Sequence, residues 1–307
     1  MNQKISLVLC FDINYANQAA VATYSAIRNS STPIQIYWIV PGNDFEATSK
    51  IYDHLKSLGF KIKLIRADES IFRGWKVAWQ ITRAAYLRLL IPDLINEEKI
   101  IYIDADVLVL SDLSEIFLND MSDLPIGSVK DISSSINATK MPWIEGDIYI
   151  NSGVMVMNLE ILRRDRFLEK CQDIYNDFEE RVVFFDQCII NKYAENRKYV
   201  LDKKWNFLIV TEDFLGVEFE TLVLSNRLKV VHFAGAVKPW QKWCNPIIAN
   251  YWWSYAKKLS IPGFRPTEIS TINQALKFAD ILYKNSNFQE SSEVKTTIIN
   301  TLLNGKS

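Results

Sequence analysis

Two acidic residues, Asp104 and Asp106, stand one residue apart between two apolar segments. The segment before them, residues 100–103, is a short apolar run typical of a strand buried on both faces, and apolar residues resume at 107–110. Burying an unpaired ionised carboxylate is costly, and two neighbouring carboxylates also repel each other. A hard divalent cation is the usual partner of carboxylates held this close. The alternative is a turn or helix cap after a strand, a common role of Asp.

A second candidate metal ligand is His232, one of only two histidines in the chain. It lies near the end of a predicted strand over 229–233, within Val-Val-His-Phe-Ala-Gly-Ala-Val-Lys-Pro-Trp. An imidazole together with two carboxylates suits Mn²⁺ and leaves coordination positions for phosphate oxygens. Lys238 could contact the same phosphates as a point charge. His54 lies on the polar side of a predicted helix and is expected to be a surface residue.

The elements before the two acids alternate between strand and helix. Apolar patterning predicts strands over 5–11, 34–40 and 61–66, and helices over 16–28 and from Asp44 to Gly59. This order is the opening of a doubly wound parallel sheet, an α/β fold. Ligands of such sheets bind at the carboxyl ends of strands, where the acids fall. No Gly-x-Gly-x-x-Gly follows the first strand, so an ordinary dinucleotide-binding fold is not supported.

The later elements are predicted in the same way. A helix over 79–90 is expected to end at Pro92, and a strand over 125–130 ends at Asp131. Two strand pieces flank Asn151-Ser-Gly153, where the glycine indicates a bulge or the close approach of a ligand. The remaining predictions are a loop over 133–147 and one long helix over 159–178. Another helix is predicted near Asp186, and this residue could simply be its N-cap. C-terminal helices are predicted from 246, over 267–284 and over 293–303.

Composition is that of a soluble globular protein, with 307 residues, 49% hydrophobic and 23% charged. The net charge of −1 argues against nucleic acid as the main partner. The four cysteines are far apart and predict free thiols in a reducing compartment. No signal peptide or membrane-spanning run is recognisable. We therefore expect a cytoplasmic protein, with peripheral contact at the inner face of a membrane left open.

Four short motifs, taken in order, resemble family 8 glycosyltransferases: Asp104-Ala-Asp106, Asn151-Ser-Gly153, Asp186-Gln187 and the segment from His232 to Trp240. The bacterial lipopolysaccharide glucosyl- and galactosyltransferases are the most similar branch. The resemblance covers residues 5–240 and implies a GT-A fold, which is a Rossmann-like, mostly parallel sheet flanked by helices. It further implies a catalytic domain over 1–244 and a helical C-terminal extension over 245–307.

The resemblance also implies a role for each matching residue. Asp104, Asp106 and His232 would bind Mn²⁺ or Mg²⁺. The donor would be bound by Asp12, Asn14, Arg88, Asp104, Ala105, Asp131, Asn151, Ser152, Gly235 and Lys238. Asp186, Gln187 and Lys238 would act in catalysis. The chain departs from the family at Cys188, where a second Asp is common and was a candidate nucleophile for double displacement, so a same-face ion-pair route is favoured.

The activity implied by the resemblance is the retaining transfer of glucose or galactose from UDP-glucose or UDP-galactose to a glycan or glycolipid acceptor, as in lipopolysaccharide biosynthesis. The loop over 133–147 and the aromatic segment over 240–253 are expected to contact the acceptor. A catalytically silent nucleotide-sugar-binding or scaffold protein is the alternative, supported by Cys188. A metal-dependent nucleotidyltransferase or pyrophosphorylase would need a Gly-rich phosphate loop after the first strand, and the sequence has none.

Overall fold

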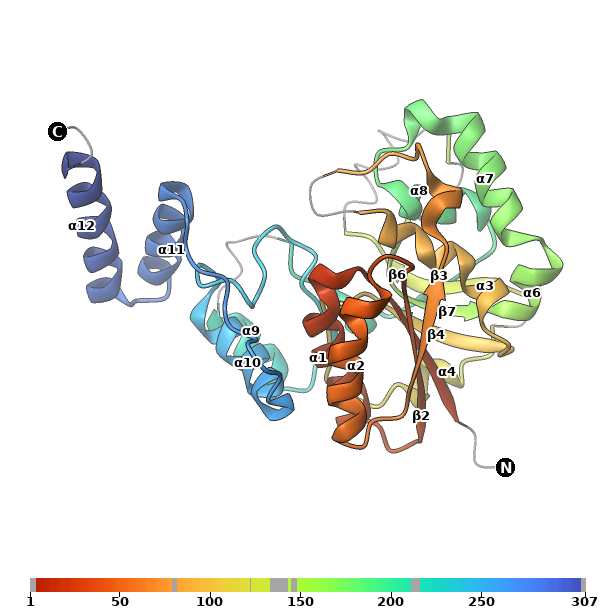
Figure 1. Cartoon of the computed structure of the whole chain (residues 1–307), viewed down its shortest axis with the longest axis horizontal. Helices are drawn as coiled ribbons and strands as arrows, with labels where there is room; N and C mark the ends of the chain where they lie inside the picture. The colour runs from red at the N-terminus through yellow and green to blue at the C-terminus, as the bar shows by residue number, and fades with distance from the viewer. Residues whose placement is uncertain are drawn as a thin grey trace.

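A seven-stranded sheet with helices on both faces forms the body of the computed structural model (Figure 1). The structure describes residues 4–78, 82–121, 123–132, 143–144, 148–210 and 216–304. Across the sheet the strands are β3 (Ile62–Ala67), β2 (Ile34–Pro41), β1 (Ile5–Cys10), β4 (Lys99–Ile103), β7 (Ile150–Asn158), β6 (Ile126–Lys130) and β8 (Lys198–Leu201). Among these seven, β7 alone runs antiparallel to its neighbours. The predicted α/β class with a mostly parallel sheet is confirmed.

The central strands are apolar throughout because both faces of the sheet are covered. On β1, Leu7 and Leu9 belong to one core cluster, whereas Val8 and Cys10 belong to the other. The first cluster lies under α1 (Ala16–Arg28), α2 (Phe45–Ser57) and α10 (Pro246–Leu259). The second lies under the 3-10 helix η3 (Arg83–Leu90) and the α-helices α3 (Ile91–Leu94), α6 (Leu159–Arg164), α7 (Phe167–Phe178) and α8 (Phe185–Tyr193). The symbol η denotes a 3-10 helix throughout.

A separate three-stranded sheet brings distant parts of the chain together. Its strands are β5 (Val107–Val109), β10 (Val230–His232) and β9 (Phe207–Leu208), in that order. The antiparallel register sets His232 opposite Val107, directly after Asp106. The remaining short elements are α4 (Ser114–Phe117), α9 (Gly216–Leu224), η1 (Ile13–Tyr15), η2 (Glu69–Phe72), η4 (Glu179–Arg181) and η5 (Lys203–Trp205).

The C-terminal region has two parts. Trp252 and Leu259 of α10 are buried in the same core cluster as Leu7 and Leu9 of β1. By contrast, α11 (Ile272–Lys284) and α12 (Phe288–Asn304) form a helical hairpin that extends away from the body (Figure 1). A capping box at Thr271 begins α11. The predicted domain boundary at 244 stays a prediction.

Several local expectations were wrong. The helix predicted over 79–90, with its end at Pro92, is a 3-10 helix from Arg83, and it is followed directly by α3, because proline is tolerated in the first turn of a helix. Residues 79–81 of that prediction lie outside the described residues. The long helix predicted over 159–178 is broken, since Arg166 has a left-handed backbone (φ 55°) between α6 and α7. The two strand pieces around Asn151-Ser-Gly153 are one strand, β7. His54 is half-buried, and its Nε2 lies 2.8 Å from the Leu259 carbonyl oxygen.

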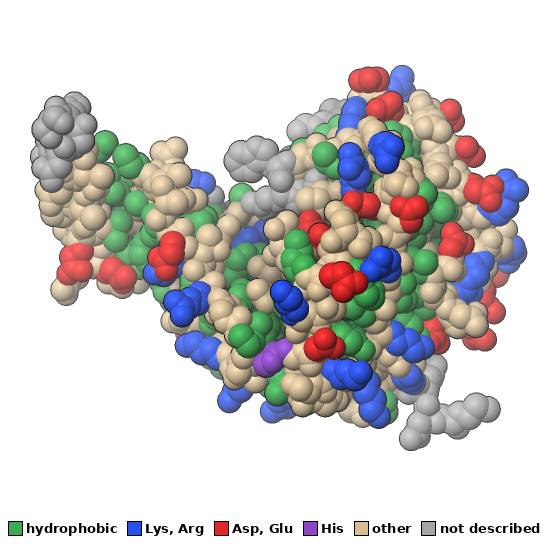
Figure 2. Space-filling model, viewed as in Figure 1, with side chains coloured by type: hydrophobic (Ala, Val, Ile, Leu, Met, Phe, Trp, Pro, Cys, Tyr) green, Lys and Arg blue, Asp and Glu red, His purple; other side chains and the backbone are tan. Residues whose placement is uncertain are grey.

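Lys/Arg and Asp/Glu side chains are interspersed over the face shown in Figure 2, in keeping with the near-zero net charge. Within the described ranges, no helix is both long and apolar enough to cross a membrane. Most of the loop predicted over 133–147 lies outside the described residues.

Candidate active site

One edge of the sheet gathers the polar residues that the sequence singled out. Asp12, Asp104 and Asp131 directly follow, or lie just beyond, the carboxyl ends of β1, β4 and β6. Because β7 runs antiparallel to β4, its first residues reach the same edge, and the Asp104 backbone N–H donates to the Gly153 carbonyl (2.8 Å). The fold therefore brings residues from four strands to one place, as expected for an α/β sheet.

Asp104, Asp106 and His232 form a group able to hold a metal ion. Each residue offers one ligand atom, and these atoms all lie within 4.8 Å of one another. His232 Nε2 lies 3.2 Å from Asp106 Oδ1 and 3.8 Å from Asp104 Oδ2. Two carboxylates and an imidazole form a donor set that fits Mn²⁺, and the carboxylates also fit Mg²⁺.

Gly153 lies directly against two members of this group, His232 and Asp104. A Cβ built at this position would lie 2.5 Å from His232 Nδ1 and 2.9 Å from Asp104 Oδ2, and closer still to His232 Cε1. The imidazole therefore occupies the space that any side chain would need. The sequence predicted a bulge or the close approach of a ligand at this glycine. In the structure, the groups that approach it closely are the side chains of His232 and Asp104.

Lys238 provides a positive charge beside the acids. Its Nζ lies 2.8 Å from Asp106 Oδ2 and donates to the Phe233 carbonyl oxygen (2.6 Å). Burial opposes ionisation of Asp106, but the charges of Lys238 and His232 prevail and lower its pKa well below the usual range. Asp106 is thus an ionised candidate ligand that is already paired with a cation.

Arg88 links the metal group to α8. Its guanidinium pairs with Asp104 Oδ1 (2.8 Å) and Asp186 Oδ2 (3.2 Å), and it donates to the Ser152 carbonyl (3.0 Å). The Tyr102 hydroxyl also donates to Asp104 Oδ1 (2.6 Å). Asp104 is therefore held by one oxygen, while its other oxygen faces His232.

Asp186 and Gln187 lie in the first turn of α8, and their side chains contact Ser152 of β7. Gln187 Oε1 accepts from the Ser152 backbone N–H (3.0 Å), and the Ser152 hydroxyl donates to Asp186 (3.3 Å). Burial raises the pKa of Asp186 to about 6; Arg88 opposes this rise and Asp104 adds to it. Asp186 was expected to be either a helix cap or a site residue. It does not cap α8, because Phe184 is at the N-cap position and the helix begins without a side-chain cap hydrogen bond.

A pocket of about 840 Å³ contains most of the predicted site residues. Lining it are Asp12, Arg88, Asp104, Ala105, Asp106, Asp131, Asn151, Ser152, Asp186, Gln187, His232 and Lys238. Two predicted donor-binding residues do not line it: Asn14, whose side chain is exposed, and Gly235. A Cβ at Gly235 would lie 2.8 Å from the Val210 carbonyl oxygen, so this glycine permits a close backbone contact.

Other residues of the site were missed by the sequence reasoning. The Thr82 hydroxyl donates to Asp12 Oδ2 (2.7 Å), and Asn206 lies 1% exposed beside His232. Neither belongs to a recognised motif. Cys188 does not line the pocket, and its buried thiol has a pKa raised by burial.

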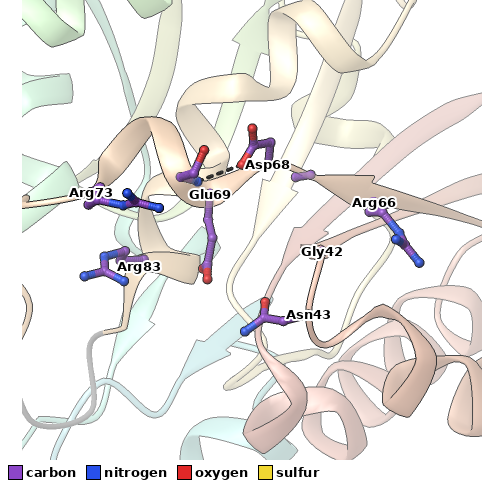
Figure 3. Close-up of a pocket in the computed structure, with 9 residues that line it drawn as sticks. Gly42, Asn43, Arg66, Asp68, Glu69, Arg73 and Arg83 are labelled. Atoms are coloured by element: carbon purple, nitrogen blue, oxygen red, sulfur yellow. Dashed lines mark hydrogen bonds between the residues drawn. The ribbon is translucent and has the colours of Figure 1, made fainter.

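A second pocket, of about 490 Å³, lies where β2 and β3 end (Figure 3). Figure 3 shows Arg73 and Arg83 on one side of Glu69 and Arg66 on the other. Arg66 is largely exposed and pairs with Glu46 (3.1 Å). Since acids offset the guanidinium charges and no predicted site residue lines this pocket, the first pocket is the candidate active site.

Comparisons with known proteins agree with this geometry. The model of the family "Glycosyl transferase family 8" matches residues 6–244. General stress protein A of Bacillus subtilis is 28% identical over an alignment of 249 residues, and the match covers 76% of this chain and 86% of that protein. The probable glycosyl transferase Gly of Streptococcus gordonii is 27% identical over 252 residues, 81% of this chain, and this chain spans only 35% of its length.

Among solved structures, galactosyltransferase LgtC in complex with donor and acceptor sugar analogues superimposes with a TM-score of 0.74. The match covers 84% of this chain and 98% of LgtC at 23% identity, which supports the GT-A fold and not a shared substrate. The family match extends over most of the chain and includes every motif described above. The chain belongs to glycosyl transferase family 8.

Proposed function

We propose that this protein is a metal-assisted retaining transferase that moves glucose or galactose from UDP-glucose or UDP-galactose to a glycan or glycolipid acceptor. The observation that supports this most directly is the group of Asp104, Asp106 and His232 beside Lys238 in the large pocket. Two ionisable acids, an imidazole and an ammonium in one cleft suit a bound cation and a diphosphate. Lipopolysaccharide assembly is the narrower form of the same proposal.

The metal site would consist of Asp104 Oδ2, Asp106 and His232 Nε2. A bound Mn²⁺ or Mg²⁺ would supply Lewis-acid stabilisation of the departing diphosphate. Arg88 and Tyr102 hold Asp104 in position through its other oxygen. Lys238 would contact the diphosphate, and its Nζ is only 2.8 Å from Asp106, so one ammonium can serve both partners.

The donor would lie along the sheet edge. We assign Asp12, Asn14, Ala105 and Gly235 to the nucleotide and its diphosphate. We assign the hexose to the residues that converge beyond the metal group, namely Arg88, Asp131, Asn151, Ser152, Asp186 and Gln187. These six all line the pocket, and together they carry hydrogen-bond donors and acceptors, which suits the hydroxyl groups of a sugar.

We propose that the configuration at the anomeric carbon of the sugar is retained by a same-face route, in which the acceptor attacks from the side that the diphosphate leaves. Cys188 is buried outside the pocket, and its thiol is held protonated by a raised pKa, so it is not placed to attack the donor. Asp186 lines the pocket but is paired with Arg88. The diphosphate oxygen that leaves the sugar would accept the proton of the acceptor hydroxyl, while Lys238 stabilises its charge. Because the same-face route needs no nucleophile at position 188, Cys188 is compatible with an active enzyme and does not by itself favour a silent binding protein.

The test is UDP release from a panel of UDP-sugars with acceptor sugars, measured with Mn²⁺ and then with a chelator. We expect release from UDP-glucose or UDP-galactose that the chelator abolishes. Asp106→Asn should abolish release and leave the fold intact. Asp165→Asn is a matched control, because both side chains are 13% exposed and paired with a cation, and Asp165 lies away from the pocket. Unchanged release by Asp106→Asn would refute the metal assignment.

A further inference from the structure

Asn206 is a buried amide that joins two parts of the candidate site. It lies between η5 and β9, and β9 pairs with β10 so that Leu208 is opposite His232. Its side-chain Oδ1 lies 3.1 Å from His232 Nδ1, and its Nδ2 donates to Asn151 Oδ1 (2.9 Å). Only 1% of its surface is exposed, so bulk water cannot take the place of either hydrogen-bond partner of Asn206.

The direction of these hydrogen bonds follows from groups whose chemistry is unambiguous. The Gly153 backbone N–H can only donate, and it donates to Asn151 Oδ1 (2.9 Å). At the other end of the same amide, Asn151 Nδ2 donates to the Asp131 carboxylate (3.1 Å). A backbone donor and a carboxylate acceptor thus fix the orientation of Asn151 from both sides.

Asn206 must then direct its NH₂ group towards Asn151 Oδ1, which leaves its own oxygen facing the imidazole. An amide oxygen accepts and cannot donate, so His232 Nδ1 must carry a hydrogen. The Nε2 atom is then the nitrogen available to a metal, and it is the one that faces Asp106 and Asp104. A hydrogen bond to the second ring nitrogen is the usual way that a ligating histidine is oriented.

We propose that Asn206 is a positioning residue, which holds His232 with a hydrogen on Nδ1 and Nε2 turned to the metal, and which couples this histidine to Asn151 in the donor pocket. The part of this inference that concerns metal and donor rests on the proposed function. The part that concerns the hydrogen on Nδ1 does not, since it follows from Gly153, Asn151 and Asn206 alone.

The first test reads the imidazole directly by NMR. With only two histidines in the chain, ¹⁵N-histidine labelling gives two ring systems, and they should differ. His54 Nε2 faces the Leu259 carbonyl, so His54 should carry its hydrogen on Nε2. In metal-free protein, His232 should show a slowly exchanging hydrogen on Nδ1, whether or not Nε2 is also protonated. Faster exchange is expected in Asn206→Leu. A bare Nδ1 on His232 in the wild type would overturn the proposal.

The second test separates the two connections of Asn206 by measuring Mn²⁺ affinity calorimetrically in the presence of UDP. Asn206→Leu removes both hydrogen bonds and should weaken Mn²⁺ binding about 10- to 100-fold, the usual effect of losing an outer partner of a ligand. Asn206→Asp keeps an acceptor for Nδ1 but has no hydrogen for Asn151. Loss of the hydrogen bond to Asn151 should raise the KM for the UDP-sugar in both variants, whereas only Asn206→Asp should keep an Mn²⁺ affinity near that of the wild type.

The control is Asn158→Ala, which removes the N-cap of α6 at the far end of β7. It should lower the melting temperature and leave Mn²⁺ affinity unchanged. If folded Asn206→Leu binds Mn²⁺ as tightly as the wild type, or if Asn206→Asp binds no better than Asn206→Leu, the positioning role is refuted. Should Asn206→Leu fail to fold, Asn206→Asp and the wild-type spectrum still decide. Wild-type protein that binds no Mn²⁺ would refute the metal site, while the spectrum would still test the hydrogen on Nδ1.

Discussion

Gly153→Ala is the substitution whose effect on the metal group can be worked out most directly. The new Cβ would lie 2.5 Å from His232 Nδ1. Ordinary contacts between such atoms begin near 3.5 Å, and His232 Cε1 would lie closer still, so the ring or the strand must move by more than about 1 Å. Metal–ligand distances tolerate only about 0.2 Å. The ring cannot easily retreat, because His232 is 5% exposed and its Nδ1 faces the buried Asn206.

Two magnitudes follow for this variant. Overpacking of this kind costs about 1–3 kcal/mol of folding free energy. Displacing a ligand should weaken Mn²⁺ binding by at least the 10- to 100-fold seen for outer partners, about 1.4–2.7 kcal/mol. Both are measurable on purified protein, the first by denaturant unfolding with chelator and the second by calorimetric titration of Mn²⁺ with UDP.

Gly127→Ala is the matched control, because it lies on the neighbouring strand β6 and is equally a glycine in a sheet. Its Cβ would lie 2.8 Å from Met121 Sδ, which belongs to a flexible side chain that can yield. We expect this variant to lose some stability and no Mn²⁺ affinity. If Gly153→Ala binds Mn²⁺ as Gly127→Ala does, the reasoning about the space behind His232 is wrong.

Two further predictions concern α8. The pKa of Asp186 is about 6 in the folded protein against an ordinary 3.8, so ionising it opposes folding. In chelator, wild-type stability should therefore fall by about 2 kcal/mol relative to Asp186→Asn as the pH rises from about 4 to 7, and parallel pH profiles would contradict this. Incubation with donor alone should leave no covalent sugar on Cys188 or Asp186 by mass spectrometry; an adduct on either would replace the same-face route with double displacement.

The sequence predicted the metal group because its signals are local. Two acids interrupt an apolar segment, and a histidine ends a strand, so residue type and position agree. Asn206 could not be found this way, since its role depends on β9 lying beside β10, a contact that no local pattern encodes. The break at Arg166 was missed for a related reason. The apolar spacing continues across it, and only the backbone, with φ 55°, shows the interruption.

Asn14 and Gly235 were predicted from the resemblance alone, and their contact with the donor stays a prediction. Both match motifs, yet the structure places neither on the pocket wall. Gly235 lies against the Val210 carbonyl, so its lack of a side chain serves packing of the chain on itself. A motif match therefore identifies a position more reliably than the reason for its residue type.

The pairing of β5 with β10 has a consequence for synthesis. Val107 and His232 are opposite each other in that small sheet although 125 positions separate them in the chain. A nascent polypeptide thus exposes Asp104 and Asp106 on the ribosome long before their imidazole and ammonium partners have been translated. Until then, Arg88 supplies the only nearby countercharge that has already emerged among the described contacts of these acids. The candidate pocket is completed late, so a product that terminated between Leu201 and His232 would keep all seven strands of the large sheet and lack the third candidate metal ligand.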